Sequence, residues 1–380
     1  MDIFEPATAS SPPAGLLWEL PLTSSHPAAH GGVRLRLQLD GNRITSANPI
    51  PGRMHRGAEK LFESRDYRSA LALANRHDWL SAFGSELGLA ELLESMLGIE
   101  VPARAVALRV LVAELCRIGH HLLWLSTTLA ELSHTEAAAV GNTAREGVLT
   151  LLQRFSGARM HLMVVTVGGL RADADQVWLR DVVTTMPGLT APLDVLTAAL
   201  DRARPVTNGV GALPTTVASE FAASGPVARA AGIPLDLRID QPTAGYRRLI
   251  DAGVLRRVVR SDGDAATRLE VLAEETRVSA DCVRFSAEEL LHQPPGPVGV
   301  TLPKVLRVPE GRGYVGTENP SGINGWYLVS RGEPTPYRLK LRTASFNNAQ
   351  TLPFALAGAD LADLPLAVMT YLLVAGDIDK

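Results

Sequence analysis

The sequence predicts an α+β protein with a helical-bundle core and small β-sheets built from the N- and C-terminal parts of the chain. Three observations support this fold class. Long segments carry apolar residues at every third or fourth position, as amphipathic helices do. Segments near both ends instead alternate apolar and polar residues, as half-buried strands do. No polar linker interrupts residues 21–380, so we expect a single domain there.

The N-terminal part is expected to contain a loose tail and a β-hairpin. Residues 1–20 are rich in Pro, Ala and Ser and are interpreted as the tail. Residues Val33–Leu39 alternate strictly, Asp40-Gly41-Asn42 supplies a turn, and Ile44–Ile50 returns. The hairpin therefore covers about residues 33–50.

The segment Ala103–Leu132 is expected to be the central helix of the bundle, about 45 Å long at ~1.5 Å per residue. One of its faces carries an apolar seam of Leu108, Leu111, Leu115, Ile118, Leu122, Leu125, Leu129 and Leu132. Nearly opposite lies a polar row of Glu114, Arg117, His121, Trp124, Thr128 and Glu131. Buried charges are costly unless paired, so this row is either a functional feature or a structural ladder of ion pairs.

The remaining elements follow from the same patterns. The helical core covers about residues 58–204, with helices expected at Ala58–Glu63, in pieces from Asp66 to Met96, at Glu136–Val165 and at Asp173–Ala203. Residues Ala265–Leu291 also look helical. The C-terminal α+β part covers about residues 305–380. Its strands are expected at Val305–Val308, Trp326–Ser330 and Tyr337–Arg342, the last two as a hairpin, before short helices.

Composition excludes several classes of protein. A net charge of −3 without a Lys/Arg tract argues against nucleic-acid binding. The two cysteines, Cys116 and Cys282, form no CxxC motif, so this chain alone offers neither a disulfide framework nor a cysteine-ligated cluster or nickel–iron site. No secretory leader opens the sequence, and the longest apolar run, Pro365–Ala375, is too short to span a bilayer. We expect a reducing, cytoplasmic setting and membrane association only through partners.

Candidate chemistry rests on scattered ionisable residues, because no dinucleotide fingerprint, P-loop, HExxH or GxSxG motif is present. Histidine beside carboxylates suits proton transfer near neutral pH. In the segment Asn75–Trp79 the plainer interpretation is a solvated helix face. A metal on His26 and His30 is disfavoured because Pro27 argues against a helix there. The candidates are His30, His55, Arg76, His77, Asp78, His121, Glu131 and His161.

An ordered series of motifs resembles the D subunit of NADH-quinone oxidoreductase, which is the 49-kDa subunit of respiratory complex I. The resemblance covers nearly the whole chain beyond the tail. Because the sequence between the motifs differs from the family pattern, the chain resembles a diverged member of the family. The motifs are His26-Pro27-x-x-His30-Gly31, His55-Arg56-Gly57-x-Glu59-Lys60, Leu97-Gly98-Ile99-Glu100-Val101-Pro102-x-Arg104, Arg109-Val110-Leu111-x-x-Glu114-Leu115-x-Arg117-Ile118, His121-Leu122-Leu123-Trp124-Leu125, Gly157-Ala158-Arg159-Met160-His161, Gly168-Gly169, Asn208-Gly209-Val210-Gly211, Gly263-Asp264, Pro336-Tyr337-Arg338-x-Lys340-x-Arg342-x-x-Ser345-Phe346 and Gly376-Asp377-Ile378-Asp379-Lys380.

The resemblance implies a fold similar to the large subunit of nickel–iron hydrogenases, without the metal. It also implies a quinone headgroup site in the cleft between this chain and the iron–sulfur subunit that carries the terminal cluster. His30 would hydrogen-bond one quinone carbonyl, and Trp79 occupies the position of the family's tyrosine, which holds the other. Glu131 falls where the family has an aspartate paired with the histidine. Arg76 and His161 would lie near the partner's cluster.

The implied function is that of a peripheral-arm subunit of a proton-translocating NADH-quinone oxidoreductase, inactive in isolation. Quinone is its substrate. The chain itself would bind no cofactor, because the iron–sulfur clusters and FMN belong to partner subunits. The implied partners are the terminal-cluster iron–sulfur subunit, the C-type subunit and the membrane-arm subunit at the quinone channel. NADH would be oxidised elsewhere in the complex. The resemblance also implies that this chain is peripheral, on the cytoplasmic side of the cell membrane.

Departures from the family pattern leave an alternative open. Indole cannot deliver a proton as phenol can, so Trp79 is the most serious departure. Ser321-Gly322-Ile323 and Leu372-Leu373 replace other charged or proline-containing family motifs. The alternative is a diverged paralogue that serves assembly or interaction with reduced quinone chemistry. A membrane-bound hydrogenase-type large subunit is disfavoured by the missing cysteine pairs.

Overall fold

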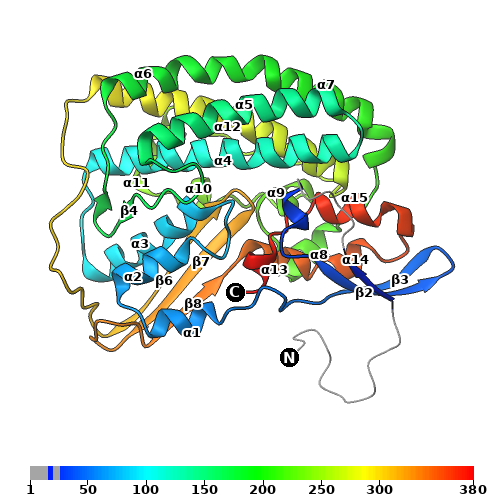
Figure 1. Ribbon diagram of the computed structural model, residues 1–380, viewed down its shortest axis with the longest axis horizontal. Coiled ribbons are helices and arrows are strands. Elements are labelled where there is room, and N and C mark those ends of the chain that lie inside the picture. Colours follow the sequence, from blue (N-terminus) through cyan, green and yellow to red (C-terminus); the bar gives the residue numbers. More distant parts are fainter. Residues whose placement is uncertain (1–15, 20–25) are drawn as a thin grey trace.

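Long helices and small sheets form separate layers in the computed structural model, which describes residues 16–19 and 26–380. Figure 1 shows the long helices stacked side by side above the sheet of the C-terminal part (orange), with a second sheet, drawn in blue, at the lower right. This arrangement confirms the predicted mixture of a helical core with small sheets. The bundle consists of α4 (Ala103–Glu131), α5 (Thr135–Ser156), α6 (Gln176–Thr185), α7 (Thr190–Thr207) and α12 (Ala265–His292).

The predicted boundaries of the helical core were wrong in several places. The bundle includes α12, which lies beyond the expected range of residues 58–204 and packs against α4. The predicted helix from Glu136 ends at Ser156, because Gly157 takes a left-handed φ of 83°. The predicted helix from Asp173 is divided by the 3-10 turn η2 (Met186–Leu189), where Pro187 lies at the N1/N2 position.

In the part of the chain that the structure describes, three sheets lie outside the bundle, with strand orders β1-β2-β3, β4-β5 and β6-β7-β8. The predicted hairpins are confirmed, because β2 pairs with β3 and β7 pairs with β8, both antiparallel. The strand predicted at Val305–Val308 was wrong, since these residues form no strand. The strands are β1 (Leu16–Glu19), β2 (Arg34–Asp40), β3 (Arg43–Pro49), β4 (Val165–Thr166), β5 (Gly169–Leu170), β6 (Gly311–Asn319), β7 (Gly322–Ser330) and β8 (Arg338–Arg342).

Strands β1 and β6 were not predicted from the sequence. Strand β1 falls within the predicted loose tail, yet it pairs with β2, so the tail prediction was wrong for residues 16–19. The rest of that tail lies outside the described residues. Strand β6 is rich in glycine, and a Cβ on Gly313 would lie 2.9 Å from Sδ of Met96. Glycine is needed there because the strand lies directly against α3. The glycines interrupt the alternation of apolar and polar residues from which a strand is predicted.

Short helices connect these layers. Asp66 caps α2 by accepting backbone N–H groups of Arg68 and Ser69, as predicted from its position. The helices α1 to α3 lead into α4, α8 to α11 lead from the bundle to α12, and the others follow β8. Their bounds are α1 (Ala58–Glu63), α2 (Tyr67–Ala74), α3 (Ala82–Leu97), α8 (Thr215–Glu220), α9 (Gly225–Ala230), α10 (Leu237–Asp240), α11 (Ala244–Asp251), α13 (Ala344–Ala349), α14 (Leu352–Ala355), α15 (Leu364–Met369) and α16 (Ala375–Ile378), with 3-10 turns η1 (Pro27–Ala29) and η3 (Leu361–Asp363).

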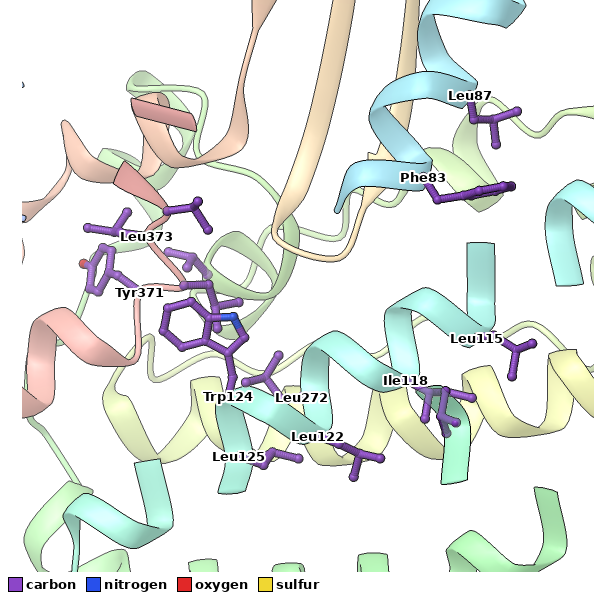
Figure 2. Close-up of a cluster of buried hydrophobic side chains, with 14 of the residues drawn as sticks. Phe83, Leu87, Leu115, Ile118, Leu122, Trp124, Leu125, Leu272, Tyr371 and Leu373 are labelled. Carbon is purple, nitrogen blue, oxygen red and sulfur yellow. The ribbon is translucent and has the colours of Figure 1, made fainter. Parts of the chain in front are cut away.

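The central helix α4 is buried along both of its predicted faces. Its apolar seam packs in the core, where Leu108, Leu122 and Leu129 are fully inaccessible to solvent. Figure 2 shows Leu122 and Leu125 on one side of α4, while the Trp124 indole points to the opposite side, towards the segment that carries Tyr371 and Leu373. Within the described residues, no helix combines the length and apolar character that crossing a membrane requires.

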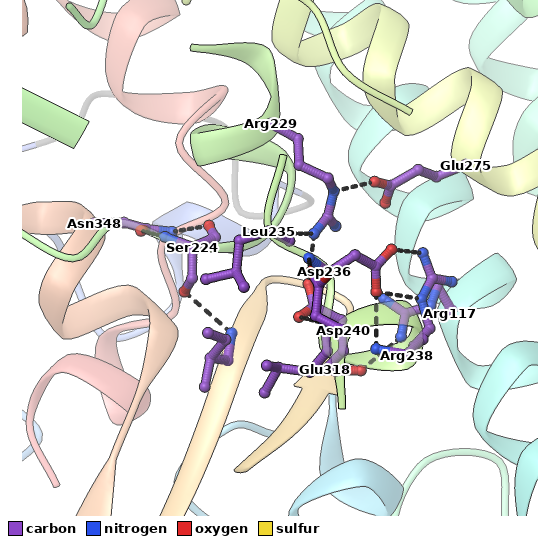
Figure 3. Close-up of polar contacts among 12 residues, drawn as sticks. Arg117, Ser224, Arg229, Leu235, Asp236, Arg238, Asp240, Glu275, Glu318 and Asn348 are labelled. Atoms are coloured by element: carbon purple, nitrogen blue, oxygen red, sulfur yellow. Dashed lines mark hydrogen bonds and ion pairs between the residues drawn. The ribbon is translucent and has the colours of Figure 1, made fainter. Parts of the chain in front are cut away.

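The polar row of α4 meets an ion cluster inside the protein (Figure 3). Glu114 lies 3.3 Å from Arg117 and 3.1 Å from Arg238, and it accepts hydrogen bonds from Ser279 and Tyr246. Burial alone raises the pKa of Glu114, but Arg117 and Arg238 lower that pKa below its ordinary value. Glu114 and Arg117 therefore belong to a network of paired charges, the structural alternative that the sequence left open.

The remaining members of the ion cluster come from segments far apart in the sequence. Arg229, at the end of α9, bridges Glu275 of α12 at 2.6 Å and Glu318 of β6 at 2.7 Å. Asp236 pairs with Arg238 at 2.7 Å. Because each of these charges is almost fully buried, each needs its partner in place, and the cluster ties α4, α9, α12 and β6 together.

A close approach of α5 to α4 gives a stability prediction. A Cβ on Gly141 would overlap Oγ of Ser126, whereas a Cβ on Gly147, in the same helix, would meet no atom within 4 Å. We expect Gly141→Ala to lower the free energy of unfolding by about 1–3 kcal/mol through overpacking. Gly147→Ala should raise it by about 0.5–1 kcal/mol through helix propensity. Urea denaturation of both variants measures this, and equal shifts would contradict the close packing.

Candidate functional site

The candidate site forms where three segments distant in sequence meet: the turn η1 with its flanking residues, the loop between α2 and α3, and the C-terminal segment. A Cβ on Gly31 would lie 2.6 Å from Cβ of Ala375, and a Cβ on Gly376 would lie 2.6 Å from the backbone oxygen of His77. Both contacts need glycine, because a side chain would separate the segments. The C-terminal segment therefore holds the other two against each other.

His30 and Trp79, which the sequence analysis assigned to the same site, lie in contact. Their rings are edge-on, with centroids 5.5 Å apart and planes at 82°. The His30 side chain is exposed and that of Trp79 is half-buried. The backbone N–H of His30 donates to the carbonyl of Pro27 at 3.2 Å, which sets the position of the residue at the end of η1. An exposed imidazole and an indole N–H are thus available side by side.

His26 has a different role from His30, although the two are close in sequence. Its side chain is fully buried, and Nδ1 accepts the backbone N–H of Ala28 at 3.2 Å, which caps η1. Nε2 lies 3.4 Å from Oγ1 of Thr128 on α4. Burial, with a smaller contribution from His30, lowers the pKa of His26 to about 3, so its imidazole is neutral. This structural role was not predicted from the sequence, because it depends on contacts with Ala28 and Thr128.

The solvated helix face considered for Asn75–Trp79 was wrong for His77 and Asp78. These residues lie between α2 and α3, and both side chains are buried. Asp78 accepts the backbone N–H groups of Leu80 and Ser81, each at 3.1 Å. Burial and the nearby Asp377 raise the pKa of Asp78 to about 7. His77 Nε2 lies 3.7 Å from Oδ1 of Asp377. The loop that leads to Trp79 is therefore held by a buried group of ionisable side chains.

Arg76 and His161 lie close enough to interact electrostatically. Arg76 is exposed, and its carbonyl accepts a hydrogen bond from Arg56 at 2.8 Å. His161 follows α5 and is half-buried. Its pKa is lowered first by burial and then by the positive charge of Arg76. The structure thus brings these two predicted residues together on one part of the surface.

Glu131 is the last residue of α4 and is half-buried. It follows Thr128 by about one helical turn, and Thr128 contacts His26 in the loop that carries His30. Its predicted pairing with His30 stays a prediction.

A narrow cleft adjoins Trp79 on the side of the bundle. It is lined mainly by the beginning of α3 and by facing residues of α4 and α5, among them His120 and Arg145, and by Arg159 just beyond α5. Among the described residues, no group of three or more His, Cys, Asp or Glu side chains is placed to hold a metal ion. The chemistry that this arrangement offers is hydrogen bonding from both His30 and Trp79, and proton exchange from the imidazole alone.

Comparisons with known proteins give a consistent result over most of the chain. The family model described as "Respiratory-chain NADH dehydrogenase, 49 Kd subunit" matches residues 132–308 and 300–380. Among solved structures, the membrane-bound sulfane sulfur reductase, an archaeal respiratory membrane complex, contains a chain with a TM-score of 0.85 and 29% sequence identity. The match covers 96% of this chain and 98% of that one.

Curated relatives carry the same family name. In Streptomyces coelicolor, the D subunit of NADH-quinone oxidoreductase that is numbered 1 is 47% identical, and the match covers 93% of each chain. The D subunit of the Geobacillus kaustophilus enzyme is 36% identical, over 93% of this chain and 96% of that protein. These relatives are subunits of an oxidoreductase complex. The chain belongs to the family of the D subunit, or 49-kDa subunit, of NADH-quinone oxidoreductase.

Proposed function

We propose that this chain forms one wall of the quinone headgroup site of a proton-translocating NADH-quinone oxidoreductase. The other wall is the partner iron–sulfur subunit that carries the terminal cluster, and electrons pass from that cluster to quinone. The observation that carries the proposal is the contact between the exposed His30 imidazole and Trp79, at ring centroids 5.5 Å apart. Both groups can donate a hydrogen bond, one to each carbonyl of a quinone lying between the subunits.

Reduction of a quinone to a quinol takes up two electrons and two protons. In our proposal His30 donates a hydrogen bond to one carbonyl and delivers a proton to it, because imidazole exchanges protons near neutral pH. Glu131 stabilises the protonated imidazole and resets it. Trp79 orients the second carbonyl through its indole N–H but cannot supply a proton. The second proton therefore comes from another donor.

Arg76 and His161 are proposed to face the partner's terminal cluster. Arg76 is exposed, so its guanidinium is available to a partner surface, and its positive charge already acts on His161. A fixed positive charge near a cluster favours its reduced state, because the added electron is attracted to it. These residues would thus tune electron delivery to the quinone.

The wider assembly follows from the same proposal. The fold is proposed to be that of a nickel–iron hydrogenase large subunit that has lost its metal, since Cys116 and Cys282 are separate residues in α4 and α12. The C-type subunit and the membrane-arm subunit at the quinone channel would be further partners. They would hold this chain at the cytoplasmic face of the cell membrane. FMN and the clusters belong to partner subunits, and the chain alone would be inactive.

Trp79 supports a second candidate function, a diverged paralogue that serves assembly with reduced quinone chemistry. The names of two relatives number their D subunits, one as 1 and the other as 2. The structural neighbour is named as a reductase of sulfane sulfur rather than of quinone. The exposed His30 beside Trp79 favours the catalytic role, because a purely assembling protein has no need of an exposed imidazole there.

The first test of the proposal removes the imidazole. We expect His30→Ala, in the complex assembled in membranes, to lower quinone reductase activity about a hundredfold or more through loss of the proton donor. The control is His292→Ala, because His292 is exposed at the far end of α12. Reduction of ferricyanide, which bypasses the quinone site, checks assembly. Undiminished quinone reduction by the His30 variant would refute the catalytic role.

The second test concerns Trp79. If Trp79 supports normal quinone reduction, Trp79→Tyr should keep turnover within about threefold, because both side chains donate a hydrogen bond. Trp79→Phe, which keeps an aromatic ring but no donor, should raise KM for a short-chain quinone about tenfold. Steady-state kinetics of both variants measures this. A large gain in turnover on introducing tyrosine would instead favour the diverged paralogue.

A further inference from the structure

A continuous chain of hydrogen bonds runs through the interior from α12 to the polar face of α4. Nε2 of His121 lies 3.3 Å from Oε2 of Glu275, and Nδ1 of His121 lies 3.1 Å from Nδ1 of His120. Nε2 of His120 accepts the indole N–H of Trp124 at 3.1 Å, and it also lies 3.0 Å from Oγ of Ser321. All five side chains are at most 2% exposed, so solvent contributes nothing to this chain.

The chemistry of its two ends determines the direction of the three bonds that connect Trp124, His120, His121 and Glu275. An indole N–H only donates, so Nε2 of His120 must carry a lone pair and its proton must lie on Nδ1. That proton is donated to Nδ1 of His121, whose own proton then lies on Nε2 and is donated to Glu275. Glu275 is ionised, since Arg229 and His121 lower its pKa against the effect of burial. Both histidines are therefore neutral, in opposite tautomers.

This chain ends against the loop that carries His30. The rings of Trp124 and His26 are in edge-on contact, with centroids 5.2 Å apart and planes at 82°. His26 caps η1 through Ala28, and η1 ends at His30. A rotation of the Trp124 ring would thus remove the surface on which His26 rests and displace the turn.

We propose that His120, His121 and Trp124 are positioning residues, which hold His30 in its place for quinone by fixing the orientation of the indole against His26. The inference rests on the proposed function and deepens it. A neutral, single-tautomer chain anchored on the ion cluster suits this role, because it permits only one orientation of the Trp124 N–H. His121 and Trp124 are fully buried, and His120 reaches only the narrow cleft beside Trp79 with 2% of its surface exposed, so the chain acts on His30 through His26 and η1.

The test replaces Trp124 by phenylalanine, which keeps an aromatic ring but removes the N–H donor. We expect Trp124→Phe, in the assembled complex, to raise KM for a short-chain quinone about three- to tenfold with little change in kcat. The matched control is Trp178→Phe. Trp178 is also buried and donates its indole N–H, to the carbonyl of Leu151 at 2.8 Å, but it lies on α6 away from His30.

A second pair of variants keeps the inference testable if Trp124→Phe assembles poorly. His120→Gln retains one acceptor and one donor, whereas His120→Leu retains neither, so KM should be closer to the wild-type value for glutamine than for leucine. Equal KM for Trp124→Phe and Trp178→Phe, or for the two His120 variants, would overturn the positioning role. If His30→Ala also leaves quinone reduction intact, the proposed function itself fails. If His30→Ala loses quinone reduction but the Trp124 and His120 variants do not differ from their controls in KM, only the positioning inference fails.

Discussion

The cost of burying charge in the middle of α4 is the constraint on which the rest of the structure depends. Glu114 and Arg117 are at most 1% exposed, and neither can stay ionised there without partners. Those partners come from α12, from the segment that includes α10, and from β6. These partners are in place only in the observed register of α4, because a shift along the helix would leave both charges buried and unpaired. The bundle and the C-terminal sheet are thereby joined in a fixed arrangement.

The candidate site inherits its geometry from this interior. His30 is exposed, but the turn before it is capped by a buried histidine that rests on Trp124 and Thr128 of α4. Trp79 lies in the loop between α2 and α3, and the buried His77 of the same loop contacts the C-terminal segment. The exposed groups are therefore presented by short loops, each tied to the core by buried polar contacts. Such support gives a loop the rigidity that an oriented hydrogen bond to a ligand requires.

Proton chemistry is unevenly distributed around this site. The neutral histidines of the interior, His26, His120 and His121, all have a pKa lowered by burial, so they serve as fixed donors and acceptors. Buried carboxyls show the opposite behaviour: burial raises the pKa of both Asp78 and Glu86 to about 7. Carboxyls that can exchange protons near neutral pH thus include Asp78, in the loop that carries Trp79, whereas the pKa values of Glu114 and Glu275 in the ion cluster are lowered by neighbouring positive charges.

The sequence by itself determined the hairpins, the long helices and both faces of α4, because these follow from local periodicity and turn chemistry. The ordered motifs also placed His30 and Trp79 in one site. Only the tertiary structure decided that Glu114 and Arg117 of the polar row are paired charges, that His26 caps η1, and that α12 joins the bundle. It also revealed β1 and β6. Each of these depends on contacts between segments far apart in the sequence, and no local pattern specifies which distant group neutralises a buried charge or receives a hydrogen bond.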